Sequence, residues 1–130
     1  MTGFSHELLH EKREATKNHC QIIGQEVNVL EGHHAIPKCM GGSNNSHNCI
    51  MLSGYDSYSV YGIKVPDVHE EADQMALKRR LFLHPDTLEY VTIDKMPEDC
   101  FRNGKNNTIY DLQVRGQEIN KKCKKKKKRR

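Results

Sequence analysis

The chain has 130 residues, a formal net charge of +4, 35 % hydrophobic residues, 29 % charged residues and no tryptophan. This length and composition predict one small domain with a modest core. No apolar run approaches the roughly 18 residues that a membrane-spanning helix needs, and the N-terminal residues lack a signal-peptide pattern. We therefore expect a soluble, intracellular protein with no membrane partner, cytoplasmic or, in a eukaryotic host, nuclear.

The cysteines are spread along the chain in a pattern that argues against two common uses. There are five, at positions 20, 39, 49, 100 and 123, and no two form a Cys-x-x-Cys pair. Neither a disulfide framework nor a four-cysteine zinc cluster is expected from such an odd, widely spaced set. We expect Cys20, Cys39 and Cys49 to be free and buried.

The first predicted element is a helix over residues 5–23, within an N-terminal segment that we bound at 1–24. Ser5 can cap the start of this helix, and Gly24 can end it. Between them, apolar residues recur at seven-residue spacing, as one helix face requires: Leu8, Ala15 and Ile22.

Residues 25–83 are expected to form the central unit, which begins with a strand. An apolar run over 27–30 leads into two adjacent histidines, His33 and His34. The strand should end near Pro37, because proline cannot donate a ladder hydrogen bond. Neighbouring strand residues point to opposite faces, so the two imidazoles can serve different roles.

A second strand and a helix follow in the same unit. A glycine-rich loop at 41–45 precedes a short apolar strand at 48–52. Asp67 follows a proline and precedes two glutamates, which is typical of a helix start. On that helix, His69 and Asp73 stand four residues apart and share a face. Strand, strand and helix with histidines at the joints is the layout of a metal site.

Residues 18–52 resemble the motif of the HNH endonuclease family, whose fold is the ββα-metal finger. The matching features are His-His-x-Ile-Pro, the Gly-Gly loop, an asparagine fourteen residues after the second histidine, and an upstream Asn-x-Cys-x-x-x-Gly run. The family usually has a second cysteine where Ile23 stands, so we expect its zinc clamp to be lost. The resemblance implies an α+β protein: an N-terminal helix, the finger, a short hairpin and a disordered basic tail.

The same resemblance implies an enzyme that hydrolyses phosphodiester bonds, in DNA rather than RNA, with one divalent cation. His33 is expected to bind the metal and His34 to be the general base, with Asn48 holding the loop that orients it. His69 and Asp73 are the expected helix-side ligands, and Asp56 is the alternative to His69. We expect Mg²⁺ or Mn²⁺, with Zn²⁺ or Ni²⁺ as alternatives. Stand-alone proteins of this type resemble homing and phage nucleases.

Several residues are candidates for contact with the nucleic acid. Arg79 and Arg80 fall late on the predicted helix, where a guanidinium could clamp a phosphate, and Lys38 follows the histidine motif. The connection at 53–68 is longer than the family's and holds three tyrosines, of which Tyr58 is the candidate contact. The alternative is that these rings cover a core poor in other aromatics.

The C-terminal part divides into a region at 84–120 and a basic tail at 121–130. A hairpin with a proline turn is expected over 81–93. Residues 109–114 are predicted to be one more strand or the last ordered piece. The tail carries nine positive charges, which leaves residues 1–120 with 12 basic and 17 acidic side chains. Its expected role is to bind phosphate, through residues that include Lys124, Lys125 and Arg129.

A second hypothesis comes from another functional class. In a non-catalytic nucleic-acid-binding module, the finger would be structural and the basic tail would still bind phosphate. The sequence leaves the target site and the choice between monomer and homodimer open.

Overall fold

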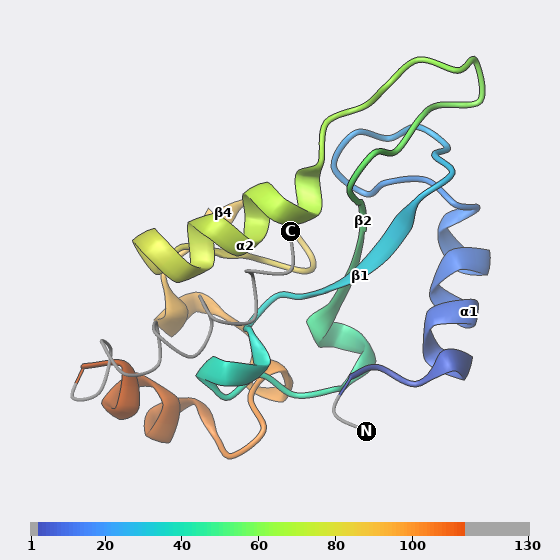
Figure 1. Ribbon diagram of the computed structural model, residues 1–130. Coiled ribbons are helices and arrows are strands. Elements are labelled where there is room, and N and C mark those ends of the chain that lie inside the picture. The colour runs from blue at the N-terminus through green and yellow to red at the C-terminus, as the bar shows by residue number, and fades with distance from the viewer. Residues whose placement is uncertain (1–2, 114–130) are drawn as a thin grey trace.

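The computed structural model describes residues 3–113, and the candidate contacts Lys124, Lys125 and Arg129 lie outside that range (Figure 1). Within it the fold is α+β, as predicted. The structure has helices α1 (His6–Thr16) and α2 (Val68–Arg79), a third helical stretch at 105–113, and two antiparallel two-stranded sheets. Strands β1 (Leu30–His34) and β2 (Cys49–Ser53) form the first sheet, and β3 (Phe82–Leu83) and β4 (Tyr90–Val91) form the second.

The first sheet lies between α1 and α2 (Figure 1). Its register pairs Leu30 with Ser53 at one end and His34 with Cys49 at the other. Every residue of β2 is buried, because helices cover both faces of the pair. The sequence predicted both strands, with the second one residue too early. Pro37 follows the end of β1, as expected.

Helix α1 begins where the sequence predicts but ends seven residues before the predicted end. Ser5 caps it by accepting a hydrogen bond from the Leu8 amide at 3.1 Å. It ends at Thr16, because Lys17 and Asn18 both have left-handed backbones, with φ of 55° and 60°. The prediction of a helix through residue 23 is therefore wrong. Ile22, assigned to its apolar face, is 41 % exposed.

Helix α2 begins at the predicted cap. The Asp67 carboxylate accepts a hydrogen bond from the Glu70 amide at 2.9 Å. The buried face of this helix consists of Val68, Ala72, Ala76 and Leu77. Its small alanines let the helix approach the sheet closely. His69 and Asp73 each follow a buried residue by one position, so they lie at the edge of this face, toward β1.

The C-terminal part confirms one prediction and corrects another. The hairpin is present, with Phe82 paired to Val91. Residues 105–113 are helical, so the predicted strand at 109–114 is wrong over its described part. The Glu98 carboxylate accepts a hydrogen bond from the Lys105 amide at 3.1 Å, which satisfies a free donor at the start of this helical stretch.

The described cysteines are also partly as expected. Cys20 and Cys49 are buried free thiols, as is Cys100. Cys39 is half-buried and disulfide-bonded, so the prediction of a free, buried thiol at that position is wrong. None of the helices within residues 3–113 is long and apolar enough to cross a lipid bilayer.

Candidate metal centre

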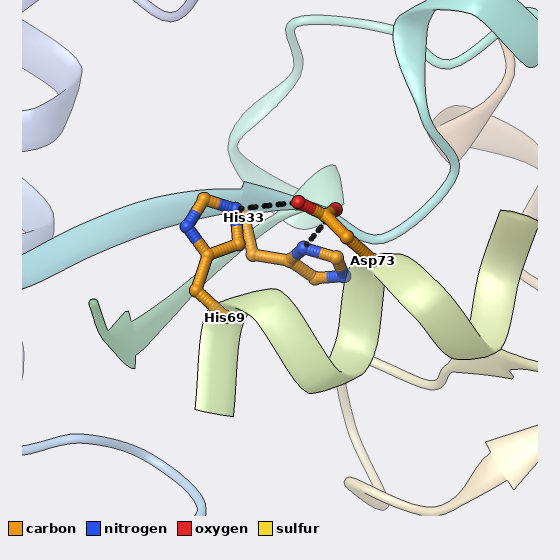
Figure 2. A group of neighbouring side chains, drawn as sticks. All are labelled: His33, His69 and Asp73. Carbon is orange, nitrogen blue, oxygen red and sulfur yellow. Dashed lines mark ion pairs between the residues drawn. The ribbon is translucent and has the colours of Figure 1, made fainter. Parts of the chain in front are cut away.

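Strand β1 and helix α2 bring three potential metal ligands together. Figure 2 shows the imidazoles of His33 and His69 facing the carboxylate of Asp73. The His33 Nδ1 atom lies 3.3 Å from Asp73 Oδ1, and the His69 Nε2 atom lies 3.6 Å from Asp73 Oδ2. One ligand atom from each of the three residues lies within 4.8 Å of the other two. We call His33, His69 and Asp73 the candidate metal centre.

The spacing and burial of these donors fit a bound cation. Two donors bonded to one ion at about 2.0–2.2 Å in tetrahedral geometry lie roughly 3.3–3.6 Å apart. The separations of 3.3 Å and 3.6 Å fall at these limits and run to different oxygens of Asp73, and one donor of each residue lies within 4.8 Å of the other two. His33 is fully buried, and its ring meets that of His69 edge-on with centroids 5.2 Å apart. The donors are therefore already close to the positions that an ion requires.

Glu31 supports the centre, although the sequence analysis did not identify it. Its Oε1 atom lies 2.6 Å from His69 Nδ1, which directs the other ring nitrogen, Nε2, toward Asp73. A carboxylate on the far nitrogen of a ligand histidine fixes the orientation of the ring and raises its basicity. Gly54 makes room for this carboxylate, because a Cβ there would lie 2.4 Å from Glu31 Cδ. The sequence does offer one sign of this contact. Side chains alternate between the two faces of a strand, so Glu31, two residues before His33, lies on the same face.

His34 is the neighbour of a potential ligand but contacts a different set of residues. Its ring stacks on Phe4, with centroids 3.8 Å apart and planes at 11°. The pKa of His34 is lowered to about 4, mainly by burial and also by the nearby His33 and Lys38, while Asn44 and Asp73 oppose the change. The imidazole is therefore neutral at pH 7.

The hydrogen bond to Asn44 decides which nitrogen of His34 can accept a proton. His34 Nε2 lies 2.9 Å from Asn44 Oδ1. An amide oxygen can only accept, so Nε2 carries the hydrogen and Nδ1 keeps the lone pair. The sequence analysis did not identify Phe4 or Asn44, because both come from loops that meet His34 only in the folded chain.

Asn48 is buried and tied to the loop that follows β1. Its Oδ1 atom accepts a hydrogen bond from the Ile36 amide at 2.8 Å. Its Nδ2 group donates to the carbonyls of Ile36 and Ser43, at 3.1 Å and 2.9 Å. One side chain thus holds both ends of the loop that carries Lys38 and leads to Asn44.

Comparisons with models of known families, with curated proteins and with solved structures found no match to this chain. What the site can do must therefore follow from its own side chains. Two imidazoles and a carboxylate can hold a divalent cation. A neutral histidine next along the strand has a lone pair on Nδ1 that can accept a proton from water.

Of the two alternatives for the helix-side ligand, His69 and Asp56, only His69 lies near the other potential ligands. His69 lies in the candidate metal centre. Asp56 is not a member of that group and pairs instead with Lys64, at 3.6 Å. Its side chain is more than half exposed. The long connection at 53–68 therefore directs Asp56 away from the centre.

The candidate nucleic-acid contacts differ in how accessible they are. Arg79 is exposed, whereas Arg80 is half-buried with Nη1 3.8 Å from Met40 Sδ. Burial lowers the pKa of Arg80, but a guanidinium stays charged at pH 7. Lys38 and Tyr58 are partly buried. Of the three tyrosines in the connection, Tyr61 is the most accessible, at 85 % exposed.

Proposed function

We propose that this protein is a metal-dependent, HNH-type endonuclease that hydrolyses phosphodiester bonds in DNA. The observation that carries the proposal is the convergence of His33, His69 and Asp73, with donors 3.3 Å and 3.6 Å apart, beside a histidine that is neutral at pH 7. The antiparallel β1–β2 pair packed on α2 supports assignment to the ββα-metal finger.

The candidate metal centre would hold one divalent cation. Such an ion supplies a Lewis acid to the scissile phosphate and charge stabilisation to the departing 3′ oxygen. We propose Mg²⁺ or Mn²⁺ as the working ion, with Zn²⁺ or Ni²⁺ as alternatives. The carboxylate of the set and bound water suit Mg²⁺ and Mn²⁺, and its two imidazoles suit Ni²⁺ and Zn²⁺. Glu31 would keep His69 aligned while the ion exchanges.

His34 would act as the general base. Its Nδ1 atom can take a proton from a water molecule, because the hydrogen on Nε2 is engaged by Asn44. The charges of His33 and Asp73 both act on the pKa of His34, so the base and the centre share one electrostatic neighbourhood. Asn48 would act indirectly, by holding the loop that leads to Asn44.

The proposed substrate is DNA, with RNA as the second choice. The described residues offer one exposed guanidinium at the end of α2, Arg79. The composition of the tail adds nine positive charges, which suit binding to phosphates without regard to base sequence.

The test is a plasmid-cleavage assay with Mg²⁺, Mn²⁺, Ni²⁺ and Zn²⁺, comparing the native chain with His34→Ala. Loss of a general base should lower the cleavage rate by about 10²–10⁴-fold. DNA affinity should be unchanged. His10→Ala is the matched control, because His10 is exposed on α1 and outside the site. A native chain that binds DNA but does not cut it with any of the four ions would instead be the non-catalytic binding module.

A further inference from the structure

A second group of ligand-type side chains lies where three distant segments meet. His47 belongs to the 3-10 turn Ser46–Asn48, and Asp99 and Cys100 belong to the 3-10 turn Glu98–Cys100. One ligand atom from each of these three residues lies within 4.8 Å of the other two. A fourth residue, Asp86, reaches the same imidazole from the β3–β4 turn.

The two nitrogens of His47 face different carboxylates. His47 Nδ1 lies 2.9 Å from Asp99 Oδ1, and His47 Nε2 lies 3.0 Å from Asp86 Oδ1. A metal-binding histidine has just this arrangement, with one nitrogen on the ion and the other donating to a carboxylate that orients the ring. The group thus contains three ligand types and the partner that a ligand histidine requires.

We propose that His47, Asp99 and Cys100 bind a second metal ion, of the Zn²⁺ type, with Asp86 orienting the His47 ring. One nitrogen, one oxygen and one sulfur donor are a set that zinc accepts. Asp99 has a side chain that is 53 % exposed, so this end of the group is open to water. This proposal does not depend on the nuclease function.

The His47–Asp99 pair would need to move only slightly to admit the ion. Tetrahedral donors at zinc bond lengths lie about 3.3–3.6 Å apart. His47 and Asp99 are closer than this, at 2.9 Å, so they must separate by a few tenths of an ångström. Cys100 is fully buried, and its Sγ atom lies 3.8 Å from the His47 carbonyl, which keeps the sulfur beside the ring.

Binding would replace protons at two atoms. The ring nitrogens of His47 contact the carboxylates of Asp99 and Asp86, and a nitrogen that binds the ion must give up any proton it carries. Cys100 is a buried free thiol, and a cysteine binds a metal ion as the thiolate. The ion would take the place of the proton on His47 Nδ1 and of the proton on Cys100 Sγ, and both protons would pass to solvent. Metal affinity should therefore rise with pH.

The site would tie the C-terminal turn to the loop that supports His34. The Ser43 amide and hydroxyl already donate to the carbonyls of Cys100 and Asp99, at 2.9 Å and 2.8 Å. Asn44, which holds His34, is the next residue, and Asn48 directly follows His47. An ion here would stabilise the loop that carries Asn44.

Cobalt can test this site separately, because thiolate-to-Co²⁺ charge-transfer absorption requires a cysteine ligand and the candidate metal centre has none. We expect the reduced, full-length protein to develop this near-ultraviolet band on addition of Co²⁺ and to lose it when Zn²⁺ competes. Cys100→Ser should abolish the band. Cys49→Ser is the matched control and should keep it, because Cys49 is a buried free thiol outside the group.

Two exposed positions keep the test decisive if Cys100→Ser fails to fold. Asp99→Asn removes a ligand and should weaken the cobalt band. Asp86→Asn removes only the orienting carboxylate and should lower metal affinity by about 10–100-fold. Absence of the band at saturating Co²⁺, or its survival in folded Cys100→Ser, would overturn the metal site. Unchanged affinity in Asp86→Asn would overturn the role of Asp86.

Discussion

The candidate metal centre and the group around His47 both combine histidine with aspartate, but in opposite settings. His33 is fully buried and lies on a regular strand against a helix. His47 is half-buried on a short turn, and its partner carboxylates are 63 % and 53 % exposed. The first arrangement is positioned by the backbone of β1 and α2. The second depends on contacts between loops, so an ion has more to contribute to its stability.

Two histidines, His34 and His47, have pKa values shifted in opposite directions. Burial under Phe4 lowers the pKa of His34, whereas the carboxylates of Asp86 and Asp99 raise that of His47. One molecule of this size thus keeps one imidazole neutral and favours charge on another. Desolvation sets the direction of the pKa shift at His34, where no carboxylate contacts the ring. Hydrogen bonding sets it at His47, where two carboxylates do.

The largest effect should come from breaking the candidate metal centre at Asp73. Asp73→Asn keeps the shape of the side chain but removes its charge, so the cleavage rate with Mn²⁺ should fall by at least about 100-fold. Asp56→Asn is the matched control, because Asp56 lies outside the centre. A greater loss of metal affinity in Asp56→Ala than in His69→Ala would give Asp56 the ligand role proposed for His69.

An intermediate effect should come from loosening His69 without removing any ligand. Glu31→Gln weakens the contact to His69 Nδ1 and should lower metal affinity by about 10–100-fold, measured by calorimetric titration. Gly54→Ala should act in the same direction, because its Cβ would collide with the Glu31 carboxylate. Gly3→Ala is the control, since a Cβ at Gly3 meets nothing within 4 Å. Equal affinities in all variants would show that Glu31 does not orient His69.

The smallest effect should be electrostatic and opposite in sign at the two histidines. In chelator-treated protein, NMR titration should place the pKa of His34 near 4 and that of His47 above 6.5. Phe4→Ala should raise the pKa of His34 by exposing the ring, and Asn44→Ala should lower it further. Asp86→Asn should lower the pKa of His47. Equal pKa values for His34 and His47 would contradict the opposite shifts expected from burial and from the carboxylates.

These shifts also give the two histidines opposite effects on stability. His34 has a lowered pKa in the folded state, so the unfolded chain takes up this proton more readily. The fold therefore loses stability as pH falls from 6.5 toward 4. His47 has a raised pKa, so its contribution is complete below 6.5 and is lost as pH rises through the folded-state value. Since the partners of His47 are exposed, we expect no more than about 1 kcal/mol from it. The difference in the free energy of unfolding between the native chain and His47→Gln, measured by chemical denaturation over this pH range, gives the contribution.

The sequence by itself determined the features that depend on neighbours along the chain. Pro37 limits β1, Asp67 caps α2, and the four-residue spacing of His69 and Asp73 puts both on one helix face. These rules act within a strand or a helical turn, so they can be read without the fold. The same rules overextended α1, because the left-handed backbone of Lys17 and Asn18 leaves no mark in an apolar repeat.

Only the tertiary structure decided which distant side chains meet. Glu31 and His69 are 38 residues apart, and His47 and Asp99 are 52 apart. Whether such pairs touch depends on how α2 packs against β1 and on how the C-terminal turns fold back over the loop before β2. Spacing carries no information on either, because packing of the whole core sets these distances. For this reason the sequence placed His33, His69 and Asp73 on the correct elements, but it did not show the partners of His34 or the group around His47.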